Sequence, residues 1–121
     1  MPGRQDIVLA RFPFTDQSGA KLRPVLTLAE LPGSHNDLIV LFITSQLDQA
    51  THGLDLILRP SDPAFRGSGL KVASAFRVGK IASMSAALIV GTLGRLDRAT
   101  FDEIIGRLTH LLRTGHHPTT G

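Results

Sequence analysis

Two short stretches of this chain carry residue types that suit phosphate chemistry. Arg23 stands at the start of one predicted strand, and the triplet Thr44-Ser45-Gln46 closes another. An arginine guanidinium presents five donors in a rigid fork that matches the oxygens of a phosphate. Hydroxyl and amide groups supply further donors. A fixed cation and clustered hydroxyls at strand ends therefore suit the recognition of a phosphodiester.

Other polar and basic residues are candidates for contact with the same ligand. The loop that precedes Arg23 is rich in Gly, Ser, Asp and Gln, which predicts either a solvated hairpin or a lid over a groove. The candidates in this region are Asp16, Gln17, Ser18 and Lys21, and a second group, Arg77 and Lys80, forms a predicted basic rim. The rim serves either a nucleic-acid backbone or solubility alone.

Each candidate at a strand end also has an alternative explanation that involves no ligand. For Arg23, the alternative is a surface cation next to Pro24 without a chemical role. Hydroxyl residues that end a strand often bond local backbone, and this alternative applies to Thr44 and Ser45. Gln46 is either a ligand contact or a turn residue.

Composition limits the class of protein. The 121 residues suffice for one compact domain, and 42% of them are apolar, enough for a core. The absence of cysteine excludes a disulfide scaffold and thiolate zinc sites and fits a reducing, cytoplasmic location. The five histidines show no metal-site spacing. We see no secretory leader, and the apolar runs are far shorter than the roughly 20 residues of a membrane span.

Charge and aromatic content bear on the partner. Thirteen Lys and Arg against ten Asp and Glu give a net charge of +3 and a pI of about 10.2, which favours a polyanionic partner. The chain has no Trp or Tyr and six Phe. We therefore expect recognition to depend on backbone and polar contacts more than on base stacking.

Hydrophobic patterning predicts seven short strands. They cover residues 7–12, 23–28, 38–44, 54–58, 71–77, 80–84 and 88–96. The third is apolar almost throughout, which predicts burial on both faces. A turn at Gly79 separates the fifth from the sixth, and residues 59–69 read as a long flexible loop. Gly91 and Gly94 in the last strand indicate sharp bending or close backbone approach.

The clearest predicted element is a helix near the end of the chain. Asp97 is its expected N-cap and Gly115 its C-terminal cap. Glu103 and Arg107 lie four residues apart and can pair. The apolar face comprises Phe101, Ile104, Ile105, Leu108, Leu111 and Leu112. Several short strands followed by one helix predict a small, curled antiparallel sheet closed by the helix, one domain over residues 1–114 with a flexible tail at 115–121.

The order and spacing of five sequence pieces resemble those of the MazF/PemK family, the toxins of type II toxin–antitoxin systems. The pieces are DIVLARFPF (6–14), LRPVLTL (22–28), ITSQ (43–46), SAFRVGKI (74–81) and GTLGRLD (91–97). The resemblance extends from residue 6 to about residue 112. It implies an SH3-like barrel of about seven strands with a C-terminal helix, mainly β and MazF/CcdB-like, that acts as a homodimer.

The resemblance also implies an activity. Most members of the family are metal-independent endoribonucleases that need no cofactor and cut single-stranded RNA at short sequences. The 2′-hydroxyl attacks the adjacent phosphate and leaves a 2′,3′-cyclic phosphate and a 5′-hydroxyl. A cognate antitoxin protein blocks the RNA groove.

Matching residue by residue places the family's catalytic arginine on Arg23 and its catalytic hydroxyl on Thr44, with Gln46 in the same motif. A guanidinium already in place stabilises the charge that builds on the phosphoryl oxygens. Because a guanidinium holds its proton tightly, we favour charge stabilisation over proton transfer for Arg23. Thr44 donates a hydrogen bond to a non-bridging oxygen or orients the 2′-hydroxyl.

The chain departs from the family in two places, and two rival functions remain. The loop at residues 15–22 carries fewer glutamates than in some relatives, so its base contacts are not implied. Gly79 and Lys80 stand where some members carry an acidic or amide residue, so Lys80 is expected on a phosphate and the cleavage sequence is not implied. The first rival is a non-catalytic toxin of the same fold that binds DNA gyrase, but inhibitors of that type use a C-terminal Trp that this chain lacks. The second is an inactive antitoxin-binding module.

Overall fold

A computed structural model of the chain describes residues 2–13, 20–33 and 36–116. The loop candidates Asp16, Gln17 and Ser18 lie outside these ranges, as do residues 117–121 of the predicted tail. Within the described ranges, no helix is both long enough and apolar enough to cross a membrane.

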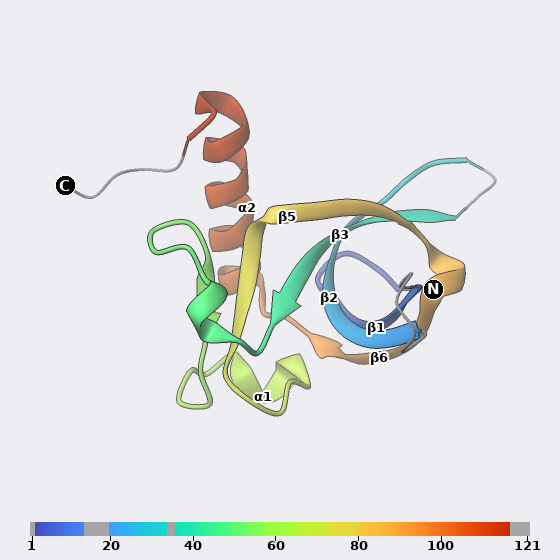
Figure 1. Cartoon of the computed structure of the whole chain (residues 1–121), viewed down its shortest axis with the longest axis horizontal. Helices are drawn as coiled ribbons and strands as arrows, with labels where there is room; N and C mark the ends of the chain where they lie inside the picture. The colour runs from blue at the N-terminus through green and yellow to red at the C-terminus, as the bar shows by residue number, and fades with distance from the viewer. Residues whose placement is uncertain (1, 14–19, 34–35, 117–121) are drawn as a thin grey trace.

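The structure is built on one antiparallel sheet of six strands (Figure 1). The strands are β1 (Asp6–Pro13), β2 (Ala20–Glu30), β3 (Asp37–Thr44), β4 (Leu56–Leu58), β5 (Ser74–Ser85) and β6 (Ile89–Arg95). Their spatial order is β4-β5-β3-β2-β1-β6, and the sheet curls strongly around its own inner face. Short 3-10 turns η1 (Leu47–Gln49) and η2 (Ala86–Leu88) follow β3 and β5. The mainly β class with a C-terminal helix is thus confirmed.

The predicted strand count and closure need correction. Among the described strands, β4 and β6 each pair with one neighbour, so the curled sheet is not a closed barrel. The predicted fifth and sixth strands are one strand, β5, and Gly79 does not end it. Pairing with β3 is nevertheless interrupted there, because Ile43 pairs with Phe76 and Leu41 with Ile81. The segment between Phe76 and Ile81 therefore bulges out of the ladder opposite a single residue of β3.

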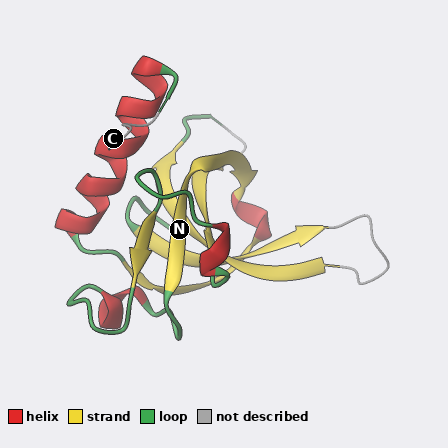
Figure 2. Cartoon of the chain, turned by 60° about the vertical axis from the view of Figure 1, so that its left-hand side comes forward, coloured by secondary structure: helices red, strands yellow, loops and turns green. Residues whose placement is uncertain are grey.

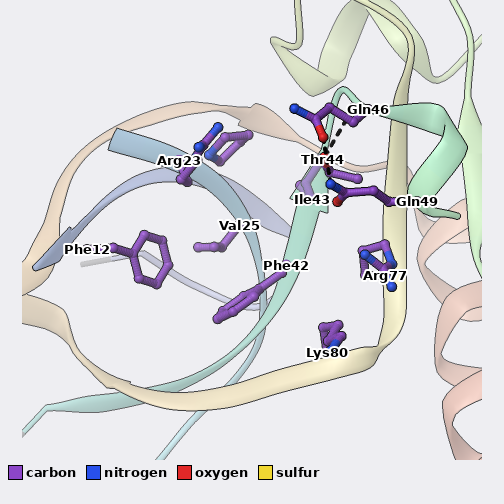
Figure 3. A pocket seen from close by; sticks show the side chains of 11 residues that line it. Phe12, Arg23, Val25, Phe42, Ile43, Thr44, Gln46, Gln49, Arg77 and Lys80 are labelled. Carbon is purple, nitrogen blue, oxygen red and sulfur yellow. Dashed lines mark hydrogen bonds between the residues drawn. The ribbon is translucent and has the colours of Figure 1, made fainter. Parts of the chain in front are cut away.

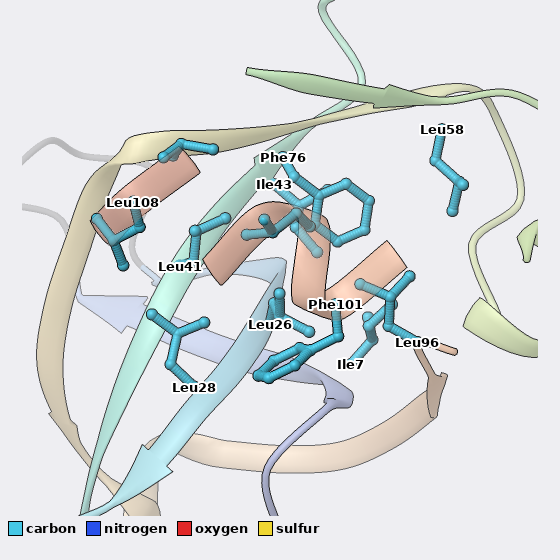
Figure 4. Close-up of a cluster of buried hydrophobic side chains, with 12 residues drawn as sticks. Ile7, Leu26, Leu28, Leu41, Ile43, Leu58, Phe76, Leu96, Phe101 and Leu108 are labelled. Carbon is cyan, nitrogen blue, oxygen red and sulfur yellow. The ribbon is translucent and has the colours of Figure 1, made fainter. Parts of the chain in front are cut away.

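The central strands are buried on both faces, as predicted for β3. In β3, Val40 belongs to a core inside the curl and Leu41 to a second core on the outer face. Successive residues of β2, Val25 and Leu26, divide in the same way. The outer core is covered by helix α2 (Arg98–Thr114), whose Phe101 packs over β1 and β2 (Figures 2 and 4).

The structure confirms the two predicted caps of α2 and its predicted Glu103–Arg107 pair. The Asp97 side chain accepts a hydrogen bond of 3.2 Å from the Thr100 backbone amide, and Gly115 ends the helix with φ of 79°. Arg107 Nε lies 3.0 Å from a Glu103 carboxylate oxygen. The apolar face is shorter than predicted, because Leu112 is 69% exposed. In the last turn of α2, Leu111 still faces β5, with its Cδ2 atom 3.9 Å from the Cβ position of Gly79, whereas Leu112 faces away.

The predicted flexible loop at 59–69 is instead a compact segment that contains helix α1 (Phe65–Ser68). Ser68 is buried, and its hydroxyl donates to the carbonyl of Phe65. A Cβ on Gly69 would collide with the Leu93 carbonyl, and one on Gly94 would collide with the Gly67 carbonyl. The close backbone approach predicted at Gly94 is confirmed.

Gly94→Ala should destabilise the protein by about 1–3 kcal/mol, because the added methyl meets backbone atoms that cannot rotate away. Gly91→Ala in the same strand is the matched control, since nothing lies within 4 Å of its Cβ position. We expect the control to change stability by less than about 0.5 kcal/mol. Urea unfolding measures both, and equal effects would contradict the packing of α1 against β6.

Candidate functional site

One pocket, of about 420 Å³, opens on the inner side of the curled sheet (Figure 3). Residues of β1, β2, β3, η1 and β5 meet there. Its lining consists of Phe12, Arg23, Pro24, Val25, Phe42, Ile43, Thr44, Gln46, Gln49, Arg77 and Lys80. Five predicted site residues, Arg23, Thr44, Gln46, Arg77 and Lys80, are therefore brought together.

Arg23 lies within β2 and not at its start as predicted, because the strand begins at Ala20. It pairs with Ala10 of β1, while pairing of β2 with β3 begins two residues later, at Val25 and Phe42. Pro24 lies in between, before the β3 ladder starts, where a missing amide hydrogen is tolerated. The Arg23 side chain is exposed and forms no hydrogen bond or ion pair with any described residue. None of its five donors is used by the described part of the chain.

Thr44 ends β3 on the same side of the pocket. Its hydroxyl oxygen accepts a bond of 3.1 Å from the Gln46 backbone amide, which is the local bonding weighed as the plainer alternative. That bond fixes the side chain and leaves the hydroxyl hydrogen as a donor. Thr44 can therefore serve both the turn and a ligand.

The turn after β3 adds two amides to the pocket. Gln49 Nε2 donates to Gln46 Oε1 over 2.6 Å, and both residues lie in the exposed η1 region. This contact fixes the Gln46 oxygen and leaves its NH₂ group, together with the Gln49 oxygen, open to a ligand. Gln49 was not identified from the sequence, because its role depends on the fold of η1.

The opposite wall is basic and comes from the bulge in β5. Arg77 and Lys80 stand on this wall, across the pocket from Arg23 (Figure 3). Arg77 Nε lies 3.0 Å from Asp55 Oδ2, and its side chain is 21% exposed. None of the described residues that line the pocket is acidic. Three cations and one donor hydroxyl therefore face a common space, an arrangement suited to an anion.

Two phenylalanines form an apolar part of the pocket that the sequence analysis missed. Phe12 and Phe42 meet edge to face, with ring centroids 5.3 Å apart and planes at 74°. The expectation of little aromatic recognition therefore needs qualification, since two of the six Phe line this one pocket. Alternation along a strand indicates which face of the sheet each Phe lies on. It does not show that the two rings meet, because that contact depends on the curl of the sheet.

Two other predicted contacts do not line the pocket. Ser45 is exposed just beyond Thr44, and Lys21 is an exposed residue of β2 opposite Phe12. No group of three or more His, Asp or Glu side chains able to hold a metal ion occurs among the residues that the structure describes.

Comparison with known sequences decides the family. The sequence model of the PemK-like, MazF-like toxins of type II toxin–antitoxin systems matches residues 3–112. The chain belongs to the PemK/MazF toxin family. The resemblance of the five sequence pieces is thereby confirmed, although no curated protein matches the chain.

Solved structures share the fold of this PemK/MazF family member. A mycobacterial endoribonuclease in complex with its cognate antitoxin is 17% identical, with 94% of this chain and 97% of that chain covered and a TM-score of 0.65. MazF from Deinococcus radiodurans is 18% identical over 93% and 97% of the two chains, with a TM-score of 0.66. A MazE–MazF structure from the same organism is 22% identical over 93% and 96%, also at 0.66. At these identities the likeness establishes the fold alone.

Titration with inorganic phosphate should perturb the side-chain Nε resonances of Arg23 and Arg77, because both guanidinium groups face the pocket. Arg98 is the control, since it pairs with Asp102 on the exposed face of α2. Two-dimensional NMR of the arginine side chains measures the effect. Equal shifts at all three arginines would contradict a localised anion site.

Proposed function

We propose that this chain is an endoribonuclease toxin that cuts single-stranded RNA at selected short sequences without a metal ion or other cofactor. The products are a 2′,3′-cyclic phosphate and a 5′-hydroxyl end, and a cognate antitoxin inhibits the reaction in the cytoplasm. Membership of the PemK/MazF family and the fold shared with endoribonucleases support this proposal.

The observation that carries it is the convergence of Arg23 and Thr44 on one basic pocket. These residues are 21 positions apart in the sequence, yet adjacent strands bring them to the same opening. A guanidinium without a partner among the described residues, a hydroxyl held by the Gln46 amide and a basic wall suit a phosphodiester. A purely structural arginine would instead be expected to hold a carboxylate or a carbonyl.

The geometry suggests a role for each group in the reaction. The 2′-oxygen forms a bond to phosphorus as the 5′-oxygen leaves, and the non-bridging oxygens gain negative charge. Arg23 stabilises that charge and Thr44 donates a hydrogen bond that orients the phosphate. The 2′-hydroxyl loses one proton and the 5′-oxygen gains one. Since no described lining residue is a His, Asp or Glu, we assign both proton transfers to water.

The remaining lining residues suit a base next to the scissile phosphate. Phe12 and Phe42 present apolar surface, and the free groups of Gln46 and Gln49 offer one donor pair and one acceptor. Stacking contributes about 1–3 kcal/mol per base, and amides distinguish base edges. Selectivity for a short sequence is consistent with this combination of a small apolar surface and two fixed amides.

The partners that we propose are a second copy of the chain and the antitoxin. Val90 and Leu93 are exposed apolar side chains on β6, an edge strand of the described sheet, and we propose that a second copy packs along this edge. Two of the similar structures are complexes with an antitoxin. We expect the antitoxin of this chain to cover the basic pocket.

Arg23→Ala should lower kcat for RNA cleavage by about 10²–10³, because it removes a donor aimed at the developing charge. The assay uses a long single-stranded RNA in EDTA, with the ends mapped for 2′,3′-cyclic phosphate and 5′-hydroxyl. Arg113→Ala, at an exposed position of α2, should cut as the wild type does.

Either of two results would overturn the proposed mechanism or activity. Normal cutting by folded Arg23→Ala would remove Arg23 from the mechanism. No cutting by folded, antitoxin-free wild-type protein would favour a toxin that binds gyrase or an inactive antitoxin-binding module.

Lys80→Ala should weaken RNA binding similarly for all sequences and reduce the slope of log K against log salt by about 0.7, the value expected for one phosphate contact on a single strand. Lys71→Ala is the matched control, because Lys71 is exposed and does not line the pocket. Fluorescence anisotropy with a 2′-deoxy oligonucleotide, which cannot be cleaved, measures both. An unchanged slope for Lys80→Ala would remove this residue from the RNA path.

A further inference from the structure

A buried carboxylate lies directly behind the basic wall of the pocket. The side chain of Asp55, in the segment between η1 and β4, is only 2% exposed and does not line the pocket. It is the acidic partner of Arg77, whose side chain does line it. Nothing in the nuclease mechanism above uses Asp55, so its burial beside the site needs a reason.

Three donors converge on this carboxylate. Asp55 Oδ2 accepts from Arg77 Nε over 3.0 Å and from the Thr51 amide over 2.8 Å, and Oδ1 accepts from the Val78 amide over 2.8 Å. Val78 and Arg77 lie in the segment of β5 that leaves the ladder with β3. The bond to Val78 therefore satisfies a backbone amide inside the bulge, and the bond to Arg77 fixes the side chain that the bulge presents.

The backbone of Asp55 is itself held from the other side. Arg107 of α2 donates to the carbonyl of Asp55 over 2.7 Å and to that of Leu54 over 3.3 Å. The Leu54 side chain lies 3.8 Å from the position that a Cβ on Gly79 would take. Asp55 thus links α2 to the bulge, because its backbone carbonyl accepts from Arg107 and its carboxylate accepts from Arg77 and Val78.

The way in which Arg77 is held leaves its terminal nitrogens available. Its ion pair uses Nε, and neither Nη atom has a hydrogen-bond partner among the described residues. A buried ion pair is a costly way to hold a loop, and apolar residues often replace one without loss of stability. An apolar residue at this point could neither accept from the Val78 amide nor hold Arg77 Nε, so the carboxylate both stabilises the bulge and orients Arg77.

We propose that Asp55 is a positioning residue of the pocket. Its carboxylate fixes the bulge of β5 and orients Arg77 so that both Nη atoms face a phosphate of the ligand. The identity of that ligand as RNA rests on the function proposed above, whereas the orientation of Arg77 does not.

The first test needs no variant and no activity. In the wild-type protein, the Nε hydrogen of Arg77 should exchange with water at least about tenfold more slowly than that of the exposed Arg113, because it is bonded to a buried carboxylate. NMR of the arginine side chains measures both rates. Equal rates would overturn the proposal whether or not the protein cuts RNA.

The second test is a double-mutant cycle. Asp55→Asn keeps the shape but places an NH₂ group against donors, and it should lower kcat/KM for RNA cleavage by about 10- to 100-fold. In an Arg77→Ala background the same change should cost less than about threefold, because the group that it positions is gone. A purely structural role would give equal losses in both backgrounds and would overturn the proposal.

Two controls separate the possible failures. Asp6→Asn also removes a carboxylate bonded to one arginine and one backbone amide, at Arg95 and Gly3, and should leave cleavage unchanged. If the wild type binds RNA but does not cut it, the nuclease function fails, and the cycle is measured as affinity for a 2′-deoxy oligonucleotide. If Asp55→Asn does not fold, equal exchange rates of Arg77 and Arg113 in the wild type would still overturn the proposal.

Discussion

Burial of β1, β2 and β3 on both faces restricts where a polar side chain can lie in this protein. One core fills the inside of the curl and the other lies beneath α2, so the interior positions of these strands are apolar almost without exception. Polar side chains remain possible where a strand leaves its neighbour. Arg23 stands just before β2 begins to pair with β3, and Thr44 is the last residue of β3. The site thus forms where the ladder between the two strands stops.

The position of the basic wall has a different explanation, because Arg77 and Lys80 lie in the middle of β5 and not at a strand end. In a regular ladder their backbone groups would all be paired and the residues would alternate between the two faces. The bulge releases the segment from the ladder, and this leaves the Val78 amide without a partner in the sheet. The carboxylate of Asp55 takes that amide and the Nε of Arg77 together. A local defect in the sheet is therefore stabilised by the contact that orients one of its cations.

Whether a feature was predicted from the sequence depends largely on how far apart in the chain the contacting residues lie. The caps of α2 depend on neighbours within four residues, and Asp97 and Gly115 were recognised from spacing alone. That Arg23 and Thr44 belong to one site was implied by the family resemblance, and both residues line the pocket. The continuity of β5 was missed, because the residue that supports its bulge lies 23 positions earlier in the chain. Phe12 and Phe42 were missed for a similar reason, since their meeting depends on the curvature of the whole sheet.

The electrostatics of the pocket favour a ligand that bridges its two walls. Arg23 on one side and Arg77 with Lys80 on the other repel each other in a space with no acidic group among its described lining residues. Asp55 offsets part of this repulsion from behind, and because it binds Nε it leaves both Nη atoms of Arg77 free of its carboxylate. An anion between the walls removes the rest of the repulsion and meets donors from both sides. The RNA proposed above would present phosphates to the basic walls and the flat faces of its bases to Phe12 and Phe42, whereas a single small anion would meet only the walls.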